Sequence, residues 1–127
     1  MSRIKGKDTK PEMIVRRFLH SAGFRYRLHV KNLPGRPDIV LPKYKTVVFV
    51  HGCFWHGHEG CRFFVIPKTR TEWWIHKIDA NKTNDSKSFN LLEDQGWTVI
   101  ELWECQLKPS NLQHTLSLLL KQLRKRN

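Results

Sequence analysis

With 127 residues and a net charge of +12, this chain is long enough to bury one core and is strongly basic. We expect a single domain over residues 1–127 and a polyanionic partner, of which nucleic acid is the usual kind. No segment approaches the roughly 20 apolar residues of a membrane span, and the N-terminus lacks the apolar stretch of a signal peptide. Three cysteines favour metal ligation in a reducing compartment over a disulfide framework, so we expect a cytoplasmic protein.

The first half of the chain predicts one helix followed by three strands. Thr9-Lys-Pro-Glu12 has the form of a capping box and opens a helix that ends at Gly23. Apolar and basic residues alternate from Phe24 to Val30, which is typical of a half-buried strand. Two apolar runs joined by a Pro-containing turn predict a hairpin: strand 38–41, turn 42–45 and strand 46–50.

The second half predicts two helices around one more strand. Thr69-Arg-Thr-Glu72 is a second capping box, and it opens a helical region that ends at Gly96 with a break around 81–85. Residues 97–103 predict a strand, and Ser110 starts a last helix with a leucine-rich face. The order of helix, three strands, helix, strand and helix indicates an α/β fold with a small mixed sheet flanked by helices.

Potential zinc ligands are concentrated in the Gly-rich loop after the second strand of the hairpin. Four residues make up a Cys3His set: Cys53, His58, Cys61 and Cys105. This set suits the tetrahedral coordination of Zn2+, and it would tie a distant strand end to the loop. His51 or His56 could replace His58, although the short spacing to the next cysteine favours His58. The alternative is a set of small buried cysteines beside an ordinary polar loop.

Residues suited to phosphodiester hydrolysis lie near the same hairpin. Asp38 stands at the start of a strand, one hairpin away from His51 and His56. Hydrolysis needs a hard cation, usually Mg2+ held by oxygen ligands, and a group that accepts a proton from the attacking water. A carboxylate and two histidines could supply both. Asp38 could instead only cap the loop before it.

Several other residues have both a structural and a functional interpretation. Glu12 could cap its helix or reach a metal-bound water, and Asp85 would ordinarily be a solvated loop acid. The pair Phe54 and Trp55 could wedge between base pairs, or it could cover the zinc site as a small core. Trp73 and Trp74 are predicted to be core residues of a helix, because of their helical spacing.

These motifs, in this order, resemble the very short patch repair (Vsr) endonucleases, which are mismatch-specific DNA-nicking enzymes. The matching segments lie between residue 1 and about residue 108: Met1–Glu12, Leu33–Asp38, Val48–His56, Thr69–Trp74, Lys77–Asn81, Asp85 and Gly96–Cys105. The resemblance implies a restriction-endonuclease-like fold with a metal site at the ends of its strands. It also implies cleavage of one strand of duplex DNA 5′ to the thymine of a T·G mismatch.

The resemblance further implies roles for the hydrolytic residues. Asp38 would bind catalytic Mg2+, helped by the backbone carbonyl of Val50. His56 would be the catalytic histidine, oriented by Asp85. His51 would bind a metal-bound water or the phosphate.

The remaining implied roles concern zinc, DNA and partners. Glu12 would lie at the edge of the Mg2+ site, and the Cys3His set would hold a structural Zn2+. Phe54 and Trp55, with Met1 from the opposite groove, would be an intercalating wedge. The implied partner is double-stranded DNA with a T·G mismatch, and mismatch-repair proteins are candidate partners. We expect a monomer, because no self-complementary apolar stripe is left over.

Two other functions fit the same residues. The first is a nuclease of the same fold, from a restriction or mobile-element system, that cuts undamaged DNA. The second is a non-catalytic zinc module that binds DNA through its basic surface. A nicking assay separates the three possibilities.

Overall fold

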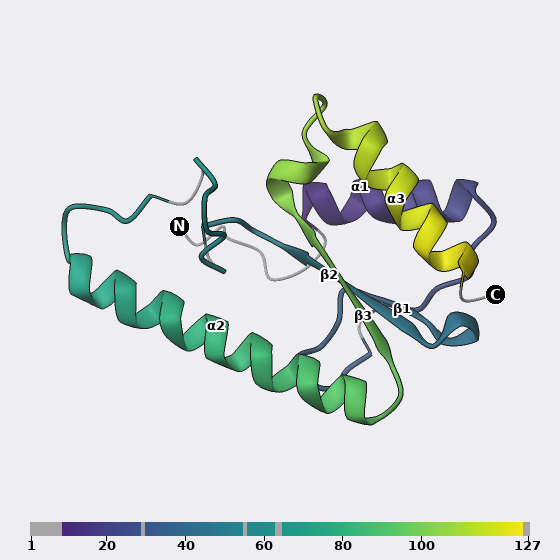
Figure 1. The fold of residues 1–127 in the computed structure, drawn as a ribbon, viewed down its shortest axis with the longest axis horizontal. Helices are drawn as coiled ribbons and strands as arrows, with labels where there is room; N and C mark the ends of the chain where they lie inside the picture. Colours follow the sequence, from purple (N-terminus) through teal and green to yellow (C-terminus); the bar gives the residue numbers. More distant parts are fainter. Residues whose placement is uncertain (1–8, 29, 55, 63–64, 126–127) are drawn as a thin grey trace.

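A computed structural model of the chain describes residues 9–28, 30–54, 56–62 and 65–125 (Figure 1). Its main elements are α1 (Lys10–Ser21), β1 (Ile39–Leu41), β2 (Thr46–His51), α2 (Thr71–Asp94), β3 (Thr98–Trp103) and α3 (Leu112–Lys125). Two short 3-10 helices, Pro42–Tyr44 and Glu104–Leu107, follow β1 and β3. The predicted small mixed α/β fold is confirmed.

The three strands form one sheet with β2 in the centre. β1 and β2 are antiparallel, with Ile39 opposite Val48, which confirms the predicted hairpin. β2 and β3 are parallel, with Thr46 opposite Thr98. Parallel neighbours need a long crossover connection, and α2 lies within that connection.

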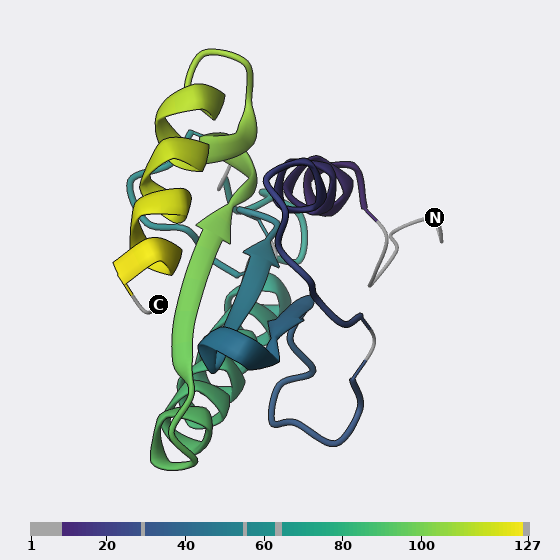
Figure 2. The ribbon, with the colours of Figure 1, turned by 90° about the vertical axis from the view of Figure 1, so that its right-hand side faces the viewer.

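Helices cover both faces of the sheet, α1 and α3 on one side and α2 on the other (Figures 1 and 2). The larger core contains the apolar faces of α1 and α3, packed on residues from all three strands, including Ile39, Val48 and Ile100. The smaller core joins Val47 and Phe49 of β2 to α2. Because β2 is buried on both faces, its sequence is a continuous apolar run.

The predicted strand from Phe24 to Val30 is wrong for the residues that the structure describes. Only Arg27 pairs with the sheet, through an isolated antiparallel bridge to Val40. β1 is three residues long, so it offers little edge for a further ladder. Phe24 still packs into the larger core, and its basic neighbour Arg25 is exposed. The alternation therefore reflects a half-buried extended segment without a strand.

Helix α2 also differs from its prediction at its start. Arg70, and not Thr69, is the N-cap residue; its φ is 57° and its side chain makes no capping hydrogen bond. The Thr71 hydroxyl instead donates to the carbonyls of Pro67 and Lys68. The second capping box is therefore wrong.

The body of α2 and its aromatic residues need two more corrections. The helix is continuous through residues 81–85, where a break was expected. Trp73 is 46% exposed and therefore does not belong to the core. No helix within the described ranges is both long enough and apolar enough to cross a membrane.

Candidate active site and metal centre

The loop after β2 folds back on itself and brings the four predicted zinc ligands together. One ligand atom from each of Cys53, His58, Cys61 and Cys105 lies within 4.8 Å of the others. His58 Nδ1 is 3.4 Å from Cys105 Sγ, and the Cys105 amide donates to Cys53 Sγ at 3.4 Å. The His58 ring stacks on Trp103 at the end of β3, with ring centroids 4.0 Å apart.

Tight turns and a glycine hold this loop against α2. The His58 amide donates to the Cys53 carbonyl at 2.9 Å, which closes a turn between two of the ligands. Gly57 has a φ of +62°, and a Cβ there would stand 2.7 Å from Ile78 Cγ2. A larger residue would therefore push the loop away from the helix.

Without a bound cation, burial disfavours the thiolate forms of Cys53 and Cys105. Burial raises the pKa of the Cys53 thiol to about 12. It raises the pKa of Cys105 as well. A zinc ion binds thiolates and would reverse this preference, releasing protons as it binds. The clustering of three thiols and one imidazole is what allows the Cys3His set to hold zinc.

Asp38 lies at the start of β1, beside the end of β2. The Val50 amide donates to Asp38 Oδ2 at 2.6 Å, and the Asp38 amide donates to the Val48 carbonyl at 3.1 Å. Burial raises the pKa of Asp38 to about 7, and the nearby Glu12 carboxylate adds to the rise. The Val50 amide and His56 oppose it. A half-buried carboxylate poised near neutral pH is typical of a functional site.

Glu12 is turned into the protein and toward Asp38. Thr9 Oγ1 accepts a hydrogen bond from the Glu12 amide, so the half of the predicted capping box that Thr9 contributes is formed at the start of α1. The Glu12 side chain is 3% exposed, and its carboxylate pairs with Arg16 at 2.6 Å. Its carboxylate is near enough to Asp38 to add to the rise of the Asp38 pKa.

His56 and Asp85 form a hydrogen-bonded pair across the loop and α2. Nδ1 of His56 donates to Asp85 Oδ2 at 2.6 Å, although the residues are 29 positions apart. Both side chains are half-buried. The interpretation of Asp85 as a solvated loop acid is therefore wrong, because it lies inside a helix and has a partner.

His51 ends β2 and is 3% exposed. Its ring centroid is 4.1 Å from that of His56 and 4.9 Å from that of Trp103. Its Nε2 lies 3.4 Å from Oε1 of Glu101, a residue that sequence reasoning did not single out. Only the parallel register of β2 and β3 could have indicated Glu101. That register places Glu101 opposite Phe49, which precedes His51 by two residues on β2.

The aromatic residues of the loop and α2 are in contact. Phe54 meets Trp74 edge-on at 5.2 Å, and Trp74 meets the exposed Trp73 in the same way at 4.8 Å. Trp74, predicted only as a core residue, therefore braces Phe54. Trp55 and Met1, the other two predicted wedge residues, lie outside the described residues.

A basic chain whose small mixed sheet collects carboxylates and imidazoles at its strand ends has the organisation of a nuclease. Known proteins with similar sequences identify the family. The family profile described as DNA mismatch endonuclease Vsr matches residues 1–62.

Relatives match most of the chain. The type II nicking enzyme V.NmeAIP of Neisseria meningitidis is 54% identical over 108 residues, which are 85% of this chain and 76% of the relative. The type II nicking enzyme V.XorIIP of Xanthomonas oryzae pv. oryzae is 50% identical over 107 residues, which are 84% of this chain and 78% of the relative. The DNA mismatch endonuclease Vsr of Escherichia coli K12 is 42% identical over 108 residues, which are 85% of this chain and 69% of the relative.

This chain belongs to the Vsr family, as the resemblance implied. It is a DNA endonuclease with the restriction-endonuclease-like fold of that family. The alternative of a non-catalytic zinc module is therefore wrong.

Proposed function

We propose that this endonuclease uses Mg2+ to nick one strand of duplex DNA 5′ to the T of a T·G mismatch, and so initiates very short patch repair. The observation that carries the hydrolytic part is the half-buried Asp38 with a pKa of about 7, beside Glu12 and near His56. The name of the Escherichia coli relative, a DNA mismatch endonuclease, supports the substrate. We further propose that residues 1–127 form one endonuclease domain that acts as a monomer.

The residues around Asp38 fit a hard divalent cation. Two close carboxylates, Asp38 and Glu12, repel each other when both are ionised, and a cation relieves that repulsion. Asp38 and the Val50 carbonyl would hold Mg2+, with Glu12 at the edge of the site. When bound, Mg2+ would neutralise charge on the phosphate and acidify the attacking water.

The imidazoles would move and hold protons around the phosphate. The carboxylate of Asp85 keeps the proton of His56 on Nδ1, so Nε2 is left as the acceptor for a proton from water. His51 would contact the phosphate or the water shell of the metal from the end of β2. Each of these groups is positioned by a different element.

The Cys3His set would hold a structural zinc, and it supports hydrolysis indirectly. His56 lies between Cys53 and His58, so the same loop carries two zinc ligands and the proposed proton acceptor. Through Cys105, zinc would join this loop to the end of β3. The position of His56 would therefore depend on the zinc site.

The aromatic residues would open the duplex. We propose that Phe54 and Trp55, with Met1 from the other groove, insert between base pairs, and that Trp74 supports Phe54 from behind. Unstacking costs a few kcal/mol and least at a mismatch, so insertion would itself favour a T·G site.

A nicking assay tests the substrate. With Mg2+, the protein is expected to nick a T·G duplex at least about tenfold faster than the matched T·A duplex, because the mismatch lowers the cost of unstacking. The measurement is the single-turnover rate on end-labelled duplexes of otherwise identical sequence. Equal rates on both duplexes would show instead a nuclease that cuts undamaged DNA.

Asp85→Asn is expected to lower the single-turnover rate at saturating DNA roughly 10- to 100-fold, because an amide no longer fixes the tautomer of His56. DNA binding should change little, since Asp85 would not contact DNA. The measurement pairs that rate with the dissociation constant of the T·G duplex. Asp79→Asn, on the exposed face of α2, is the matched control. An equal loss in both variants would contradict the role of Asp85.

A further inference from the structure

A second cluster of potential metal ligands lies beside the Cys3His set and shares no residue with it. His51, His56 and Asp85 each offer one ligand atom, and these three atoms lie within 4.8 Å of one another. They come from the end of β2, the following loop and the middle of α2. The fold therefore brings together donors that are far apart in the sequence.

His51 is the member of this cluster that points to a ligand. Its side chain is 3% exposed, and Nε2 has no hydrogen-bond partner within the part of the chain that the structure describes. A buried polar nitrogen without a partner is costly, and such a group calls for an explanation. The closest carboxylate oxygen is Oε1 of Glu101 at 3.4 Å, in a geometry that makes no hydrogen bond.

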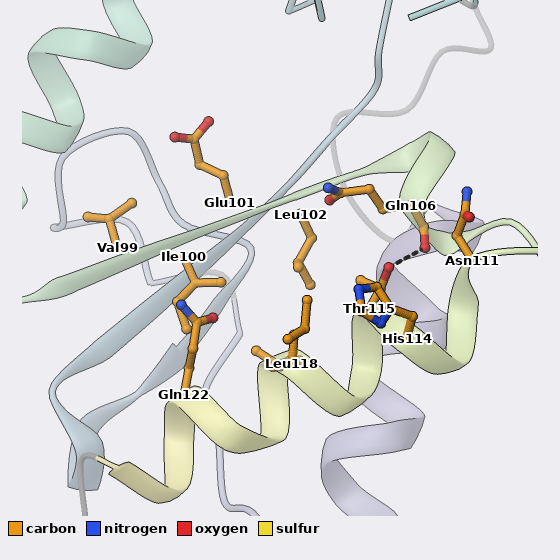
Figure 3. Close-up of a pocket in the computed structure, with 11 residues that line it drawn as sticks. Val99, Ile100, Glu101, Leu102, Gln106, Asn111, His114, Thr115, Leu118 and Gln122 are labelled. Carbon is orange, nitrogen blue, oxygen red and sulfur yellow. Dashed lines mark hydrogen bonds between the residues drawn. The ribbon is translucent and has the colours of Figure 1, made fainter.

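Glu101 adds a fourth donor from β3. It projects to the opposite side of β3 from Leu102 and α3, and so toward the face that carries His51 (Figure 3). Glu101 is among the residues around the groove of about 510 Å³ between β3 and α3, but its side chain points away from α3, whereas Leu102 points toward it. Glu101 also lines an open cleft of about 350 Å³ together with His56 and Asp85, which gives an ion a path to the cluster.

We propose that His51, His56, Asp85 and Glu101 form a second site for a borderline divalent cation such as Zn2+, and that its occupation blocks hydrolysis. Two imidazole nitrogens and two carboxylate oxygens suit Zn2+, whereas Mg2+ prefers oxygen ligands alone. The two carboxylates balance the charge of the ion within a basic protein. A ring nitrogen of His56 that binds the ion is withdrawn from proton transfer.

The inhibition rests on the proposed function, because it assumes that His56 accepts a proton. The binding of the ion does not rest on it. The site contains no thiolate, so we expect it to bind Zn2+ more weakly than the Cys3His set. It would therefore fill only after the structural site is saturated.

Cobalt titration of the zinc-loaded protein tests the binding. Co2+ is expected to add about one further equivalent, with visible absorption but without the thiolate-to-cobalt charge transfer of a cysteine site. Added Zn2+ should remove that absorption. Glu101→Gln should weaken the binding of this equivalent roughly 10- to 100-fold. Glu93→Gln, on the exposed surface of α2, is the matched control and should bind as wild type does.

Nicking assays on the same proteins test the inhibition. At saturating Mg2+, the second equivalent of Zn2+ should reduce nicking of the T·G duplex, and more Mg2+ should not restore it. Glu101→Gln should need a correspondingly higher Zn2+ concentration for the same fractional inhibition. The rate of each variant is compared with its own rate without added Zn2+.

Two results would overturn the second site. One is a zinc-loaded protein that binds no further Co2+. The other is inhibition that Mg2+ reverses and that Glu101→Gln leaves unchanged, which would place the ion at Asp38. If the protein nicks no duplex under any condition, the proposed function fails, but the cobalt titration still decides whether the site exists.

Discussion

Asp38→Asn is expected to abolish nicking and, at the same time, to stabilise the protein. The amide cannot replace a carboxylate in holding Mg2+, so the single-turnover rate should fall roughly 1000-fold or more. The same change removes a carboxylate whose ionised form is disfavoured by burial and by Glu12. The free energy of unfolding at about pH 8, without Mg2+, should rise by about 1–3 kcal/mol.

The two effects of Asp38→Asn are measured separately, by the nicking rate and by urea denaturation. Asp94→Asn, an exposed carboxylate at the end of α2, is the matched control and should change neither quantity. A variant that lost both activity and stability would show that Asp38 is mainly a structural residue capping its loop.

The pH dependence of stability follows from the direction of the Asp38 shift. The folded-state pKa of about 7 lies above the ordinary carboxyl value of 3.8, so the folded protein binds this proton more tightly than the unfolded chain does. The contribution is fully present below pH 3.8 and is lost as the pH rises to about 7. The stability gap between Asp38→Asn and wild type should therefore open between these two values and stay constant above them. Urea titrations across this range measure it, and a gap that is independent of pH would contradict the raised pKa.

Removal of zinc is the second change with a large expected effect. Cys105→Ser, or chelation, should leave the protein without bound zinc and lower nicking at least about 100-fold, because the loop that carries His56 loses its tie to β3. Much of the helix content should remain, since the larger core contains none of the described residues of the loop from 52 to 61. Elemental analysis, far-ultraviolet circular dichroism and the nicking rate measure these three outcomes.

His114→Asn is the matched control for the zinc experiment. His114 lies exposed on α3 and is not one of the four residues of the Cys3His set, so the variant should keep about one zinc per chain and its activity. Wild-type protein that is active but contains no zinc after purification without chelators would contradict the zinc assignment.

Many local features could be predicted from the sequence because they depend on neighbouring residues. The continuous apolar run of β2 and the helical periodicity of α1 and α3 indicate their elements directly. The close spacing of Cys53, His58 and Cys61 indicates a shared ligand set, because a short loop keeps its ends together. The local predictions that were wrong concern where an element begins and whether a segment pairs with the sheet. In the segment after α1, apolar and basic residues alternate, but the segment forms no strand ladder.

The functional contacts that no local sequence pattern indicates depend on how α2 and β3 pack against β2. The resemblance to the Vsr family implied one of them, the pairing of Asp85 with His56. Asp85 lies in a polar stretch that looks like a loop, and only the placement of α2 against the loop gives it His56 as a partner. Glu101 looks like an ordinary exposed residue of a strand, and only the parallel register brings it to His51. Trp74 has the spacing of a core residue, yet it contacts Phe54.

The amino-acid sequence alone therefore determines the chemistry that this protein can carry: the acid, the imidazoles, the thiols and the basic surface. Family membership follows from the order of the same motifs. The tertiary structure decides which of these groups meet and how they are ionised. Burial near Glu12 gives Asp38 its raised pKa, and packing across the sheet separates the Cys3His set from the cluster of His51, His56 and Asp85. These are properties of distance and desolvation, which no local pattern contains.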